Sequence, residues 1–166
     1  MPSSSLLDEI AWNPSFHHHQ VILSGNVSES SLRGTTQSAL FYIEDYYRFH
    51  LGKKFESLHP MVLHVIREAI QNSQQHRLRC DSPIVYCLFI GEKGVCHGFH
   101  DGGEYFKRDE IKRIFETKTP LREFDQRVPS RRIGVRDYIY PYSDVIEVDT
   151  NAGVLYCAQS IEDFLV

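Results

Sequence analysis

Apolar residues recur at steps of three and four in two long segments, which predicts two amphipathic helices. The first covers residues 30–51, and aromatic side chains broaden its apolar face. The second covers residues 60–76, where Pro60 suits the first helical position because a missing N–H costs nothing there. The positions that carry the two apolar faces are Leu40, Ile43, Tyr47 and Leu51, then Val62, Ile66, Ala69 and Ile70.

Short apolar runs bounded by turn residues predict strands around these helices. Residues 84–90 are continuously apolar, and residues 95–100 follow a Gly-Glu-Lys-Gly turn, so the two runs should pair as an antiparallel hairpin. The remaining expected elements are strands at residues 20–24, 145–148 and 154–158 and a short surface helix at residues 106–116. This mixture of helices and antiparallel strands predicts an α+β fold.

The second helix carries a polar stripe beside its apolar face. Met61 and Val65 begin the stripe, and Glu68, Asn72 and His76 continue it at helical steps. Glu68 and Asn72 are one turn apart, so their polar heads lie roughly 5–6 Å from each other. A carboxylate can orient a water there, and an amide oxygen can reach Mg²⁺, which prefers oxygen ligands. A solvated helix face would show the same pair, so the assignment depends on other motifs.

Two further motifs support the assignment of Glu68 and Asn72 to a binding site. His100-Asp101-Gly102-Gly103 follows an expected strand, and residues 131–135 precede the last two strands. Together, E-x-x-x-N on a helix, D-x-G after a strand and a late glycine resemble the GHKL ATPase superfamily. Its members, among them gyrase B, certain chaperones, histidine kinases and mismatch-repair ATPases, share the Bergerat-type nucleotide-binding fold. The segment REAIQNSQQH is similar to the N box of this superfamily, and the resemblance covers residues 20–160.

The resemblance implies a two-layer α/β sandwich, in which helices cover one face of a mixed, mostly antiparallel sheet. Residues 1–166 would form a single ATP-binding domain, with residues 1–16 as an N-terminal extension. The implied cofactors are ATP and Mg²⁺. A chain of this length, with no phosphoacceptor-histidine helix pair before the domain, is similar to the anti-sigma-factor serine kinases. That class implies a Mg²⁺-dependent protein serine kinase, a regulatory protein partner and a homodimer.

Each matching residue receives a role from the family pattern. Glu68 would be the catalytic base that orients and deprotonates the attacking water or hydroxyl, which requires hydrogen-bond reach. Asn72 would be the metal ligand that holds Mg²⁺ against the phosphates. Asp101 would accept a hydrogen bond from the adenine amino group, because an ionised carboxylate only accepts. Gly103 would let the base approach the backbone, since glycine has no Cβ to collide with the ring.

Three positions depart from the pattern around the phosphates. Glu104 stands where another glycine is usual, Arg132-Ile133-Gly134 stands where the second box would read G-x-G, and Val154 replaces a common serine or threonine. Such glycines expose backbone N–H groups to phosphate. Arg132 could supply positive charge instead, with Gly134 as the remaining glycine. The departures favour a degenerate GHKL-fold interaction module that no longer binds nucleotide and uses its aromatic first helix. A general ATPase is a separate alternative.

The composition agrees with an ordinary globular protein, because 42% of the 166 residues are hydrophobic and 24% are charged. A net charge of −4 gives no general attraction to nucleic acid or anionic membrane. No apolar run approaches the ~20 residues of a membrane span, so a cytoplasmic location is expected. The four cysteines lack C-x-x-C spacing, which argues against zinc. His17, His18 and His19 would alternate across a strand, which favours a polar strand entry over a metal site.

Overall fold

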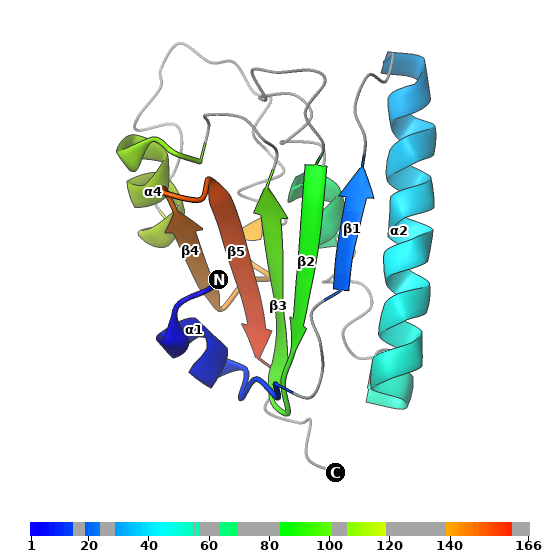
Figure 1. The fold of residues 1–166 in the computed structure, drawn as a ribbon, viewed down its shortest axis with the longest axis horizontal. Helices are drawn as coiled ribbons and strands as arrows, with labels where there is room; N and C mark the ends of the chain where they lie inside the picture. Colours follow the sequence, from blue (N-terminus) through cyan, green and yellow to red (C-terminus); the bar gives the residue numbers. More distant parts are fainter. Residues whose placement is uncertain are drawn as a thin grey trace.

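The computed structural model describes residues 1–14, 19–23, 29–54, 56, 64–69, 84–100, 106–118 and 139–160. These described residues form one five-stranded sheet with the strand order β1-β2-β3-β5-β4, and every adjacent pair is antiparallel. The strands are β1 (His19–Leu23), β2 (Ile84–Ile90), β3 (Gly94–His100), β4 (Val145–Asp149) and β5 (Val154–Ser160) (Figure 1). The expected strands are therefore confirmed, and so is the α+β class. The Bergerat-type arrangement remains a prediction.

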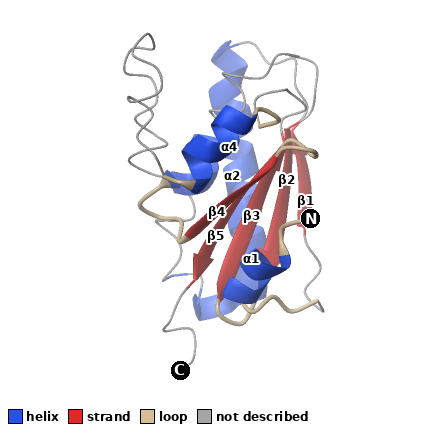
Figure 2. Ribbon diagram, turned by 90° about the vertical axis from the view of Figure 1, so that its left-hand side faces the viewer, coloured by secondary structure: helices blue, strands red, loops and turns tan. Residues whose placement is uncertain are grey.

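Helices cover one face of this sheet and enclose the main core. α2 (Glu29–Leu51) contacts β1, and α4 (Asp109–Glu116) contacts β4 at the other edge. Both helices lie on the same side of the strands (Figure 2). Residues 64–69 are also helical and contribute three buried residues to this core, Val65, Ile66 and Ala69. The helices expected at residues 30–51 and 106–116 are confirmed, with α4 beginning at Asp109, and the 64–69 segment falls inside the helix expected at residues 60–76.

The strand side chains alternate between two cores, because successive residues of a strand point to opposite faces. On β2, Ile84, Tyr86, Leu88 and Ile90 face the main core under the helices. Phe89 points the other way and packs in a second, smaller core with residues of β3 and β5. The continuous apolar run that predicted this strand therefore reflects burial on both faces.

The second face of the sheet is partly covered by α1 (Ser4–Glu9), which lies in the expected N-terminal extension. Leu6 and Ile10 are buried there against residues of β2, β3 and β5. The Ser3 hydroxyl accepts from Leu6 N–H (3.2 Å) as the helix N-cap, and the Ser3 N–H donates to a Glu147 carboxylate oxygen (3.0 Å). Helices on one face alone were expected, so α1 is a correction. The physical reason is that the second face of the sheet also carries apolar side chains, and burying them under α1 removes them from water.

The chain after α1 runs past the β2–β3 turn (Figure 1) and requires a glycine there. The Ile10 carbonyl accepts from Lys93 N–H (3.0 Å), and Trp12 forms a bridge with Gly91. A Cβ on Gly91 would lie 1.9 Å from the Ile10 oxygen, so only glycine permits this approach. The tight contact fixes the N-terminal segment against the hairpin.

The turn that closes the β4–β5 hairpin needs a glycine for its backbone conformation, so no bound ligand is required to account for Gly153. Asp149 Oδ1 accepts from the backbone N–H of Asn151 and of Ala152, both at 3.0 Å. Gly153 then adopts φ 68°, a left-handed conformation that favours glycine, and its N–H donates to the Asp149 carbonyl (2.8 Å). Val154, one of the departures from the family pattern, is the first residue of β5 directly after this turn.

Candidate functional site

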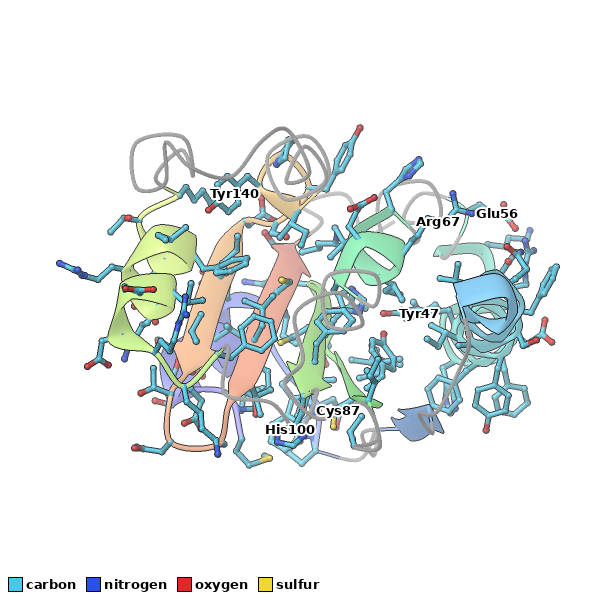
Figure 3. All side chains as sticks on the ribbon, turned by 90° about the horizontal axis from the view of Figure 1, so that it is seen from above. Tyr47, Glu56, Arg67, Cys87, His100 and Tyr140 are labelled. Atoms are coloured by element: carbon cyan, nitrogen blue, oxygen red, sulfur yellow. The ribbon has the colours of Figure 1, made fainter. Side chains whose placement is uncertain are left out.

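The 64–69 segment positions the one predicted site residue that the structure describes, Glu68. Val65 and Ile66 on the inner side of the segment are fully buried, which fixes the rotation of the helix. His64 stacks on Tyr142, ahead of β4, with ring centroids 6.4 Å apart. Arg67 is exposed (Figure 3), whereas Glu68 is half-buried. Glu68 therefore lies at the boundary between core and surface, one helical turn from the buried Val65.

Partial burial makes the Glu68 carboxyl a stronger base than an exposed one. Its pKa is raised, chiefly because burial removes water from the charged form, while the positive charges of Arg67 and His64 oppose the rise. A carboxylate with a raised pKa accepts a proton more readily, which is the property that a general base needs. Shifts of this kind gather at functional sites, although partly buried structural carboxylates show them as well.

The remaining predicted site residues lie outside the described residues. They are Asn72, Asp101, Gly103, Arg132 and Gly134. β3 ends at His100, so the D-x-G motif begins one residue after a confirmed strand, as the sequence analysis expected. The chemistry of Glu68, a half-buried carboxylate on a helix, fits the role that the resemblance gives it beside a nucleotide. Asn72 is the predicted metal ligand, and within the described ranges no group of three or more His, Cys, Asp or Glu residues could hold an ion.

A buried polar cluster that the sequence analysis missed joins α2 to the sheet. Tyr47 comes from α2, Tyr86 from β2, His97 from β3 and Gln159 from β5. All four are at most 3% exposed. Figure 3 shows Tyr47 reaching from α2 toward the strands, on the opposite side of the sheet from His100 and Cys87.

Hydrogen bonds in the cluster determine which nitrogen of His97 carries its proton. The Gln159 amide N–H donates to the Tyr142 carbonyl (2.7 Å), so the amide oxygen faces His97 Nε2 (3.2 Å) and can only accept. His97 Nε2 must therefore be the protonated nitrogen, and Nδ1 must be an acceptor. The Tyr47 and Tyr86 hydroxyls both lie 2.7 Å from Nδ1 and 3.0 Å from each other. One tyrosine hydroxyl can therefore donate to Nδ1 while the other donates to the oxygen of the first, and either tyrosine can take either role.

Burial keeps this cluster neutral. The pKa of His97 falls to about 4, because the charged imidazolium would lose its hydration, and the bond to Gln159 only partly offsets that loss. The pKa values of Tyr47 and Tyr86 are raised well above the usual value, mainly by burial. Because the four side chains are buried and hydrogen-bond to one another, we assign the cluster a structural role. It ties α2 to three strands.

A signal for this cluster was present in the sequence. His97 lies between Val95 and Phe99 at steps of two, so a polar residue occupies the core side of a strand. Gln159 does the same on β5 after Leu155 and Cys157. A histidine at a core position requires hydrogen-bond partners, but only the strand order brings β3 beside β5 and supplies them.

The described cysteines behave as small apolar residues and pack in the two cores. Cys87, Cys96 and Cys157 are free thiols, and burial raises the pKa of each, to about 12 for Cys157. A thiol with a raised pKa forms little thiolate at neutral pH and is a poor nucleophile. Cys80 lies outside the described residues. These three thiols are therefore not candidates for nucleophilic catalysis.

No protein-family model and no curated protein sequence matches this chain. Among the described residues, no helix has both the length and the apolar character needed to cross a bilayer.

Proposed function

We propose that the chain is an ATP-binding regulatory protein of the GHKL type, which transfers a phosphoryl group to a protein serine with Mg²⁺. The observation that carries the proposal is Glu68, a half-buried carboxylate of raised pKa within the predicted N-box helix. An antiparallel sheet covered by helices agrees with this class. A regulatory protein partner and a homodimer belong to the same proposal.

The roles of the chain's own groups follow from their chemistry. Glu68 would take the proton of the attacking hydroxyl, because its carboxylate is only partly hydrated and is held by a packed helix. Bound Mg²⁺ would supply neutralising charge at the phosphates. The residues that would bind ATP and its metal are Asn72, Asp101, Gly103, Arg132 and Gly134.

Isothermal titration calorimetry with ATP and Mg²⁺ tests the nucleotide assignment. Wild-type protein should bind ATP, and Asp101→Asn should weaken binding by about tenfold or more, because the carboxylate acceptor for the adenine amino group is lost. Asp109→Asn, at the exposed start of α4, is the matched control and should bind like wild type. Equal affinity of wild type and Asp101→Asn would contradict the adenine assignment.

Incubation with ATP labelled on the γ-phosphate tests Glu68. With water as the acceptor, labelled inorganic phosphate and ADP should form with wild-type protein. This turnover should be lost in Glu68→Gln, which keeps the shape of the side chain and removes its basicity. The fold should remain intact, since the substitution removes a partly desolvated charge. At neutral pH the unfolding midpoint should therefore be at least that of wild type. Glu92→Gln, an exposed turn residue, is the control, and undiminished turnover in Glu68→Gln would contradict the catalytic role.

A second candidate function is a nucleotide-blind interaction module. The observation that favours it is the set of exposed aromatic residues on α2, of which Phe49 is 83% exposed. Val154 adds support, because it stands where the family pattern commonly has a serine or threonine. This candidate predicts no heat of ATP binding for wild type, so the same calorimetry separates the two functions.

A further inference from the structure

The outer side of α2 displays large aromatic side chains while its inner side is buried. Ile43 and Tyr47 are at most 1% exposed, whereas Phe41, Tyr42 and Phe49 are 59%, 53% and 83% exposed. α2 lies at the edge of the sheet beside β1, so its far side faces away from the strands (Figure 1). Exposed apolar groups that gather on one side of an element mark an interaction surface.

A carboxylate lies at the centre of these aromatic groups. Asp45 follows Phe41 by four residues and precedes Phe49 by four, so the three side chains lie one above another on the helix. Asp45 is exposed, and it makes no ion pair or hydrogen bond with the described part of the chain. We call Phe41, Tyr42, Asp45 and Phe49 the outer stripe.

The neighbouring cation does not neutralise the outer stripe. Arg48 is bonded to Glu44 (2.9 Å) and to Glu56 (3.0 Å), so its charge is already shared between two carboxylates. The outer stripe therefore offers one negative charge between aromatic rings. This arrangement suits a cation, because ring faces attract ammonium and guanidinium groups and a carboxylate pairs with them.

A second copy of the chain is a poor match for this charge pattern. In a two-fold pairing of α2 with itself, the same residues meet across the axis. Placing Phe41 against the partner's Phe49 would set the two Asp45 carboxylates opposite each other. Like charges facing each other in a contact oppose association.

We propose that the outer stripe is a docking surface for a protein helix that presents a lysine or arginine between apolar side chains. The apolar side chains of the partner helix would cover the rings, and its cation would pair with Asp45. The inference rests on the same α2 surface as the second candidate function and names its partner, and it does not depend on the proposed nucleotide chemistry. Glu68 lies on a different helical segment, so either proposal can fail alone.

The test measures binding of two synthetic helical peptides to the full chain by fluorescence anisotropy. Both peptides carry leucine at helical spacing, and they differ only in a central arginine or glutamate. The arginine peptide should bind wild-type protein about tenfold more tightly than the glutamate peptide. Phe49→Ser should weaken binding of the arginine peptide several-fold, because an apolar contact is lost.

Charge reversal supplies the decisive control. Asp45→Arg should reverse the preference, so that the glutamate peptide binds more tightly. Glu92→Arg changes the net charge by the same amount in the exposed β2–β3 turn and should leave the preference unchanged. Equal binding of the two peptides to wild type, or equal effects of the two reversals, would overturn the proposal. Self-association in sedimentation velocity that Phe49→Ser abolishes would also overturn it, because the occupant would then be a second copy.

Discussion

Acid should destabilise the fold through His97, because its imidazole is buried as the neutral form. The unfolded chain takes up a proton near the ordinary histidine pKa of 6.5, whereas the folded chain does so only at about 4. Between these values the unfolded state binds more protons, so stability falls as the pH falls. The stability contribution is present above pH 6.5 and is lost progressively toward pH 4.

The size of this effect follows from the two pKa values. Their difference is 2.5 units, and each unit corresponds to about 1.4 kcal/mol, which gives about 3.5 kcal/mol for the whole range. Between pH 7 and pH 4.5 the loss should be about 2.5 kcal/mol. That is a large part of the roughly 5–15 kcal/mol that stabilises a typical domain.

Urea unfolding at pH 7 and pH 4.5 measures this loss when wild type is compared with His97→Gln. A glutamine can accept from a tyrosine hydroxyl and donate to Gln159, and it does not titrate. Subtracting the two pH dependences removes the contribution of every other titrating group. His100→Gln, at the end of β3, leaves the cluster intact and controls for the loss of a histidine outside it. If wild type and His97→Gln lose stability equally, the imidazole is not buried in its neutral form.

Three further substitutions test the buried hydrogen bonds and the packing. Tyr47→Phe and Tyr86→Phe should each lower the free energy of unfolding by about 1 kcal/mol in urea, because the other hydroxyl can still donate to the imidazole. The double variant leaves the buried Nδ1 without a donor. Its loss of stability should therefore exceed the sum of the two single losses by about 1 kcal/mol or more. Additive costs would contradict the shared acceptor. Gly91→Ala should displace the N-terminal segment, since the new Cβ would collide with a backbone carbonyl, and the emission of Trp12, the single tryptophan, should shift to the red. An unchanged emission spectrum would show that the contact with the β2–β3 turn is not tight.

The candidate site was predictable from the sequence where local spacing determines the outcome. The stripe from Val65 to Glu68 changes from apolar to polar at helical steps, and the structure makes the first residue buried and the second half-buried. The raised pKa of Glu68 was not predictable, because it depends on how much water the neighbouring segments exclude. The charges on Arg67 and His64 lower the pKa of Glu68, and the size of that effect depends on their distance from its carboxyl group.

By itself, the sequence determined the elements of this fold. The short apolar runs of β2, β3 and β5 and the period of three to four along α2 and α4 are local properties of the chain, because backbone geometry dictates which neighbouring residues share a face. The turn at Asp149 and Gly153 belongs to the same class, since its hydrogen bonds join residues that are near in sequence.

Only the tertiary structure decided which faces meet. The strand order places β3 beside β5, so that His97 can bond to Gln159, which lies 62 positions further along the chain. α1 covers the second face of the sheet because apolar residues there would otherwise stay in water, and nothing in its own six residues specifies that partner. Burial, shifted pKa values and satisfied polar groups arise from contacts between distant segments. They depend on the packing of the whole chain rather than on any local pattern.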